Sequence, residues 1–225
     1  MSTLRALHGS SVGRKLVMAV SGGFLVAFVV LHMAGNLKAF QGAEVFNHYA
    51  AFLREVGSPL VPPMSILWAM RLGLLALVVV HIWSAWTLTK ESRAARRTRY
   101  RVRQSQVHSY ASRTMRWGGV IVAAFILYHL LHMTVGSVHP AFVHEDAYGN
   151  LVAGLAVPWV ALVYIVAVSA LCLHLQHGIW SAFQTLGVAD PRPKGRGRRI
   201  SAAVAAVVWA GYLSVPVAIL LGIVR

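Results

Sequence analysis

Five long apolar stretches constrain the fold of this chain more than any other feature of its sequence. A helix needs about 20 apolar residues to cross the hydrocarbon core of a bilayer, and five stretches meet that length. They are approximately residues 15–37, 64–89, 116–138, 156–181 and 200–223. Backbone groups find no water partners in lipid, and these stretches lack the alternating pattern of barrel strands. We therefore expect an all-α integral membrane protein in which residues 1–225 form a single membrane domain.

The overall composition agrees with a membrane protein. Of the 225 residues, 57% are hydrophobic and only 12% are charged, whereas about 25% of the residues of a soluble domain are charged. The single cysteine, Cys172, lies in an apolar stretch, which excludes disulfides, cysteine-ligated iron–sulfur clusters and a C-x-x-C-H haem attachment. Any metal must therefore be held by other residue types.

The basic residues are concentrated on one side of the predicted bundle. If the five helices alternate in direction, the N-terminal segment, the 90–116 loop and the 190–199 loop share a side, and together they contain 17 of the 21 Lys and Arg residues. By the positive-inside rule this side is cytoplasmic, and the N-terminus with it. The net charge of +15 is then a topology signal, so we expect no nucleic acid partner. The dense basic run from Lys90 to Arg103 is either a solvated loop or a surface for anionic lipid or an acidic protein.

Six of the eleven histidines fall inside the predicted spans. They are His32, His81, His129, His132, His174 and His177. Ionisable side chains are costly in a bilayer and are usually functional there, although a single membrane histidine is often only an interhelical hydrogen-bond partner. Four different helices each supply at least one of these histidines, which favours a shared function.

The expected depths of four of these histidines divide them into two pairs. At a rise of about 1.5 Å per residue, His32 lies ~25 Å and His129 ~20 Å from the cytoplasmic ends of their helices, in the outer half of the bilayer. His81 and His174 each lie only ~14 Å from the cytoplasmic ends, in the inner half. Two pairs at two depths are typical of two bis-histidine haems stacked across a helix bundle.

Other metal sites fit the pattern less well. The spans contain no Asp or Glu, which disfavours a di-iron site, a 2-His-1-carboxylate iron site and a proton relay, and zinc would need a tighter cluster. Spacing alone leaves two choices open, because residues three apart share a helix face. These are His129 or His132 in the third span, and His174 or His177 in the fourth.

Four basic residues cluster at the inner ends of the first and third predicted helices. They are Arg14, Lys15, Arg113 and Arg116. Their cationic groups are placed to neutralise haem propionates or to orient a quinone carbonyl, although the positive-inside rule predicts basic residues at the same positions. Ser11, one turn before Lys15, is a further candidate for a quinone site.

Several motifs resemble those of one known family, and the resemblance covers nearly the whole chain. They are SVGRKLVMA from Ser11, LHMAGN from Leu31, FNHYA from Phe46, YHLLH from Tyr128 and HLQHGIWSAFQTLG from His174. The chain thereby resembles the single-subunit, five-helix, dihaem cytochrome b anchors of succinate dehydrogenases and fumarate reductases, the succinate:quinone oxidoreductases. The motif that begins at His174 is the most specific of them.

The resemblance implies a set of haem ligands. His32 with His129 would hold the outer haem b, and His81 with His174 the inner haem b, which agrees with the pairing by depth. His132 and His177 are additional histidines that the bis-histidine pattern of the family does not require.

The resemblance also implies a function in the respiratory chain. Such an anchor passes electrons from an iron–sulfur subunit through two b haems to a quinone, here expected to be menaquinone. The iron–sulfur subunit and an FAD-containing flavoprotein that oxidises succinate dock on the cytoplasmic face, so this chain itself needs no catalytic residue. The expected location is the bacterial cytoplasmic (inner) membrane, as a multi-pass protein whose other partners are lipid and quinone. A higher oligomer of the complex is a further expectation.

Two alternatives remain open on the sequence. One is the dihaem quinol-reactive subunit of another respiratory reductase, either a fumarate reductase or a membrane nitrate reductase, although the nitrate reductase subunit pairs its ligands at longer spacings within helices. The other is a non-redox membrane anchor or transporter, in which the histidines only form hydrogen bonds.

Overall fold

The computed structural model of the chain describes residues 10–94, 110–188 and 195–225. This part of the chain consists of helices joined by turns and contains no strand. The elements, in chain order, are α2 (Ser11–Asn36), the 3-10 helix η1 (Leu37–Gln41), α3 (Ala43–Glu55), α4 (Ser65–Ala94), α5 (Tyr110–His129), the π-helix η2 (Leu130–Val135), α6 (Ala147–Leu155), α7 (Pro158–Thr185) and α8 (Arg196–Leu220). In α5, the side chains of residues 110–114 lie outside this description.

Five of these helices are long and apolar enough to cross a membrane. They are Ser11–Gln41, Ser65–Ala94, Met115–Val135, Pro158–Thr185 and Arg196–Leu220. The predicted all-α fold with five transmembrane helices is therefore confirmed. The first helix begins earlier than expected because the Ser10 hydroxyl accepts a hydrogen bond from the Gly13 N–H at 2.9 Å, which caps the helix at Ser11.

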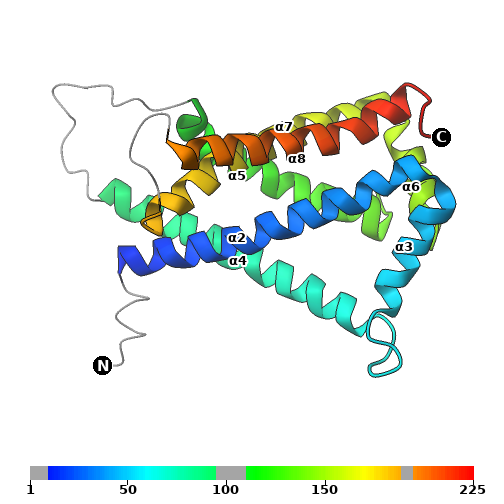
Figure 1. Ribbon diagram of the computed structural model, residues 1–225, viewed down its shortest axis with the longest axis horizontal. Helices are drawn as coiled ribbons and strands as arrows, with labels where there is room; N and C mark the ends of the chain where they lie inside the picture. Colours follow the sequence, from blue (N-terminus) through cyan, green and yellow to red (C-terminus); the bar gives the residue numbers. More distant parts are fainter. Residues whose placement is uncertain (1–9, 95–109, 189–194) are drawn as a thin grey trace.

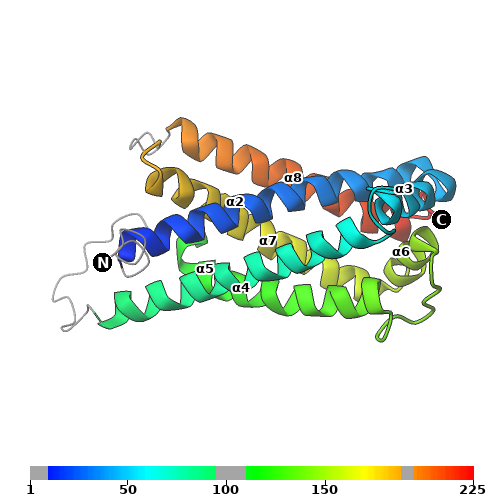
Figure 2. The ribbon, with the colours of Figure 1, turned by 90° about the horizontal axis from the view of Figure 1, so that it is seen from below.

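The five spanning helices run along the long axis of the molecule (Figures 1 and 2). Helix α7 packs against α2, α5 and α8, and α2 also packs against α4. Helix α4 diverges from α2 toward the end where α3 and α6 lie (Figure 1). We call this end, where the C-terminus also lies, the C-terminal end of the bundle. The opposite end, where α2 and α8 begin, is the N-terminal end.

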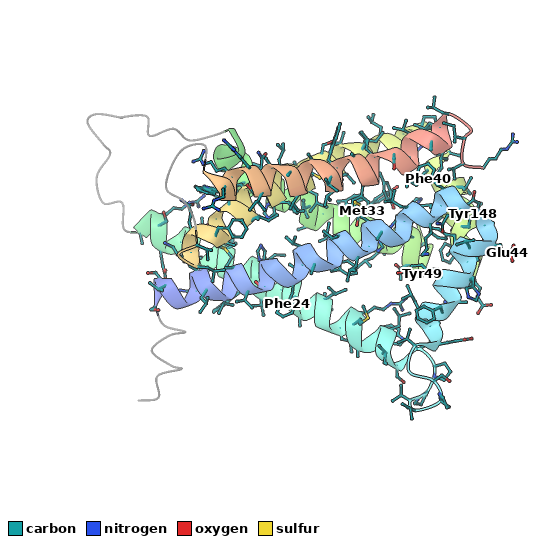
Figure 3. The ribbon with its side chains drawn as sticks, viewed as in Figure 1. Phe24, Met33, Phe40, Glu44, Tyr49 and Tyr148 are labelled. Atoms are coloured by element: carbon teal, nitrogen blue, oxygen red, sulfur yellow. The ribbon has the colours of Figure 1, made fainter. Side chains whose placement is uncertain are left out.

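The buried core lies mainly between α2, α7 and α8. Met33 of α2 points toward α8 (Figure 3) and belongs to a buried cluster that also contains Val208 of α8 and Cys172 and Leu175 of α7. A second cluster, at the C-terminal end, joins η1, α6, α7 and α8 around Leu155, and it includes Tyr164. Helix α4 contributes no apolar side chain to either cluster.

Large apolar side chains cover the outside of the spans. The exposed ones include Trp68, Leu75, Trp117, Leu162 and Val207. A soluble protein rarely exposes so continuous an apolar surface. Lipid chains are the natural neighbours for these side chains, as the five-span topology requires.

The short helices α3 and α6 were not predicted as separate elements. They meet at the C-terminal end through Asn47 of α3 and Asp146, which caps α6. The Asp146 carboxylate accepts hydrogen bonds from the Gly149 N–H (2.9 Å) and from the side-chain NH₂ of Asn47 (3.0 Å). The side-chain oxygen of Asn47 in turn accepts a hydrogen bond from the Tyr148 N–H (2.9 Å). These donors lower the pKa of Asp146, the Gly149 N–H having the largest effect. Two segments about 100 residues apart in sequence are thereby tied together.

Replacing Asp146 by alanine should destabilise this end of the bundle by about 1 kcal/mol, the usual contribution of an N-cap side chain. Because the folded pKa lies below the unfolded value of about 4, the charge contributes stability above that pH and loses it as the pH falls through the folded pKa. Thermal unfolding of the detergent-solubilised protein between pH 7 and 3 measures this effect. Asp146→Asn is the control, since it keeps a capping oxygen but should lose the pH dependence. An Asp146→Ala protein that melts like the wild type at pH 7 would contradict this assignment.

Candidate functional site

The first histidine pair consists of His81 on α4 and His174 on α7. Their ring centroids are 6.3 Å apart, with the ring planes inclined by 69°. Both side chains are half-buried within the bundle. The neighbouring histidine of α7, His177, lies one turn closer to the N-terminal end. The fold therefore brings together the two histidines that were predicted to form the inner pair.

Ser21 of α2 fixes the orientation of His81. Its hydroxyl lies 3.2 Å from His81 Nδ1 and donates to the Met18 carbonyl, also at 3.2 Å. Because the hydroxyl proton is used on Met18, the Ser21 oxygen accepts from the Nδ1–H of His81. That arrangement leaves Nε2 of His81 free to bind a metal. In a ligand histidine one ring nitrogen usually binds the metal while the other donates its N–H to an acceptor.

Two glycines leave space beside this pair. A Cβ atom on Gly22 of α2 would lie 3.2 Å from His81 Cε1, and one on Gly119 of α5 would lie 3.5 Å from His174 Cε1. Side chains at these positions would crowd the imidazoles. Neither residue was singled out from the sequence, although each belongs to a Gly-Gly pair within a span, Gly22-Gly23 and Gly118-Gly119, which was the available signal.

The second pair consists of His32 on α2 and His129 at the end of α5. Their ring centroids are 5.9 Å apart, with planes inclined by 81°. Phe28 stacks on His32 at 5.3 Å, and Phe125 lies 5.8 Å from His129. The predicted outer pair is thus also brought together, in an aromatic environment.

The two pairs lie at different depths in the bundle. Ser21, which contacts His81, and His32 are 11 residues apart on the same helix, a separation of about 16 Å along the helix axis. The second pair is therefore nearer the C-terminal end, where the chain continues into α3 and α6. The arrangement agrees with the two depths predicted from the sequence.

The third span separates His129 from His132. Helix α5 ends at His129, and the chain continues as the π-helix η2, whose wider turn changes the direction of the next side chains. His132 is completely buried and stacks on Tyr128 (5.4 Å) and on His139 (4.7 Å). A Cβ on Gly154 would lie 3.1 Å from its Nε2, so this nitrogen faces α6. His129, and not His132, is the histidine of this span whose ring faces His32.

The polar residues predicted to cluster at the N-terminal end do not form one site in the described part of the chain, unlike the two histidine pairs. The half-buried Arg14 forms an ion pair with Glu91 of α4, a partner that was not expected from the sequence. The others with described side chains are exposed: Ser11, Lys15 and Arg116. The side chain of Arg113 lies outside the described residues. The Arg14–Glu91 ion pair ties the start of α2 to the end of α4.

The donor set suits haem. Two imidazoles that bind opposite sides of one metal ion have centroids roughly 6 Å apart, because each metal–nitrogen bond is about 2 Å. Both pairs have this spacing. Across residues 10–94, 110–188 and 195–225 there is no group of three or more His, Cys, Asp or Glu side chains that could hold a metal ion. Paired imidazoles without further protein ligands are what a porphyrin-bound iron requires, because the porphyrin supplies the other four ligands.

Comparisons with known proteins identify the family of this chain. The family model for the succinate dehydrogenase/fumarate reductase transmembrane subunit matches residues 87–213. The succinate dehydrogenase cytochrome b558 subunit of Bacillus subtilis (strain 168) is 24% identical over 182 residues, which cover 81% of this chain and 81% of that protein. No solved structure matches the chain. The family match spans more than half of the sequence, and the chain belongs to the succinate dehydrogenase/fumarate reductase transmembrane subunit family, as a membrane anchor of that enzyme complex.

Proposed function

We propose that this anchor holds two b haems and delivers electrons from its soluble partner subunits to a quinone in the membrane. The observation that carries the proposal is the presence of two facing imidazole pairs, supplied by four different helices at two depths. Interhelical hydrogen bonds alone do not require two imidazole pairs that both have the spacing of a bis-histidine metal site.

In this proposal each pair holds one haem. His81 and His174 would hold the haem nearer the N-terminal end, and His32 and His129 would hold the haem nearer the C-terminal end. When bound, haem b supplies reversible one-electron transfer, which the side chains of this chain do not provide by themselves. Ser21 orients His81, and the apolar residues around both pairs exclude water. Burial and ligand orientation are the means by which the protein adjusts the redox potentials.

The proposed orientation places the N-terminal end of the bundle on the cytoplasmic side. The excess of Lys and Arg in the segments at that end supports it. We propose that the FAD-containing and iron–sulfur subunits dock there, where basic side chains such as Lys15 and Arg116 are exposed. The His81–His174 pair is then the inner pair, and the His32–His129 pair the outer pair. The proposed electron acceptor is a quinone, with menaquinone as the first one to test.

The test is to purify the complex through a tag on this chain and to count its haem. We expect a b-type alpha band in the reduced-minus-oxidised spectrum, two haems per chain, and reduction of these haems by succinate. A complex that contains this chain and its soluble partners but has no alpha band would overturn the proposal. His48→Ala serves as a control for histidine substitution, because His48 is exposed on α3 and its loss should leave the haem count unchanged.

A further inference from the structure

The phenol of Tyr164, on α7, lies between two histidines of the third span. Its oxygen is 2.9 Å from Nδ1 of His132 and 3.3 Å from Nδ1 of His129. The Tyr164 ring also packs against Phe125 at 5.0 Å, edge to face. The side chain is buried, with an exposed fraction of 9%, so solvent does not compete for these hydrogen bonds.

The directions of the two hydrogen bonds follow from proton counting. If His129 binds iron through Nε2, its Nδ1 carries the hydrogen and donates to the Tyr164 oxygen. The single phenol proton of Tyr164 is then available for Nδ1 of His132, at the shorter of the two distances. The result is a chain of donors that runs from His129 through Tyr164 to His132.

His132 is held in place to accept this hydrogen bond. Its ring lies against His139, and His139 is itself fixed on both nitrogens. The His139 Nε2 is 2.8 Å from the carbonyl oxygen of Asn150, to which it donates, and its Nδ1 accepts from the Ala141 N–H at 3.0 Å. A fully buried, stacked His132 has no freedom to turn away from Tyr164.

We infer that Tyr164 is the positioning residue of the outer haem site, where it fixes the orientation of His129 and keeps His132 from competing for the iron. The inference rests on the proposed function, since it assigns a role next to a proposed ligand. Tyr164 acts through His129 and is not itself a ligand. Tyr164 accepts from Nδ1 of His129 at the outer site, as Ser21 accepts from Nδ1 of His81 at the inner site.

A measurable consequence is the potential of the outer haem. An acceptor on the Nδ1–H of a ligand histidine makes the imidazole a stronger electron donor, which stabilises ferric iron and lowers the reduction potential. The hydrogen bond from Tyr164 to His132 polarises the phenol oxygen and makes it a better acceptor. Removing the phenol hydroxyl should therefore raise the potential of the outer haem and leave the inner haem unaffected.

The experiment is a redox titration of the complete complex that carries Tyr164→Phe, followed at the b-type alpha band. We expect the haem count to stay at two per chain, one of the two transitions to move to higher potential, and the other to stay at its wild-type value. The low-spin EPR signal of the shifted haem should change as well, because it reports the orientation of the axial imidazoles. Two transitions at wild-type potentials in this variant would overturn the inference.

Tyr128→Phe is the matched control. The Tyr128 ring stacks on His132, but its buried hydroxyl has no hydrogen-bond partner among the described residues. The substitution removes a hydroxyl from the same cluster without breaking the proposed chain, so both potentials should stay at their wild-type values. A shift in Tyr128→Phe as large as that in Tyr164→Phe would show that any buried hydroxyl matters here, and would also overturn the inference.

A second variant keeps the inference testable if Tyr164→Phe fails to assemble. His132→Ala leaves Tyr164 in place but removes the group that polarises it, so the same transition should rise by a smaller amount. If this variant has the wild-type potential, the proposed chain is wrong. The proposed function fails on a different result, namely the absence of haem from the wild-type complex or the retention of both haems when His129 is replaced.

Discussion

Replacing His174 by alanine is expected to reduce the haem content of the complex from two per chain to one. His174 is the α7 member of the inner pair, with its ring 6.3 Å from that of His81. Without His174, the proposed haem would keep only His81 of the two facing imidazoles. Haem per chain in the detergent-purified complex, with the alpha band of the remaining haem, measures the effect.

The matched control for this prediction is His177→Ala. His177 lies one helical turn from His174 on the same helix and is likewise half-buried, so the two substitutions cost similar packing. We expect His177→Ala to keep both haems. If His174→Ala retains two haems, or if His177→Ala is the variant that loses one, the assignment of the inner pair is wrong.

The second large effect is expected in the third span, where His129→Ala should lose the outer haem and His132→Ala should keep it. His129 faces His32 at 5.9 Å, whereas His132 stacks on His139 and its Nε2 faces Gly154. His132→Ala should nevertheless lower the melting temperature, because it empties a completely buried position. Haem content and thermal unfolding, measured on the same preparations, separate the two roles.

An opposite result would be equally clear. If His132→Ala loses one haem while His129→Ala keeps two, then His132 is the ligand and the pairing of His129 with His32 is incidental. The inner haem should be unaffected in both variants, because His81 and His174 contact neither residue. Loss of both haems in either variant would show that the sites are not independent.

The sequence by itself determined the five membrane-spanning helices of this protein. Twenty or more apolar residues in lipid have one favourable backbone conformation, the helix, because no water is present to satisfy the peptide groups. The number of spans follows directly from that constraint. Histidine depth also follows, because the rise of a helix is fixed, and it predicted one pair from the first and third spans and one from the second and fourth. The choice of His129 and His174 within their spans was implied by the family resemblance.

The tertiary structure decided two features that do not follow from the regular period of a helix: the direction of one histidine side chain and the hydrogen bonds between helices. In the third span, an ideal α-helix would place His129 and His132 on one face, but the π-helix η2 turns His132 toward α6 and His139. The partners Ser21 and Tyr164 were likewise beyond the sequence, because each lies on a different helix from the histidine that it contacts, 60 and 35 residues away. Long-range hydrogen bonds of this kind depend on how the helices pack. The sequence determined which helices carry the histidines, and their packing decided that Nδ1 of His81 lies against Ser21 and Nδ1 of His129 against Tyr164.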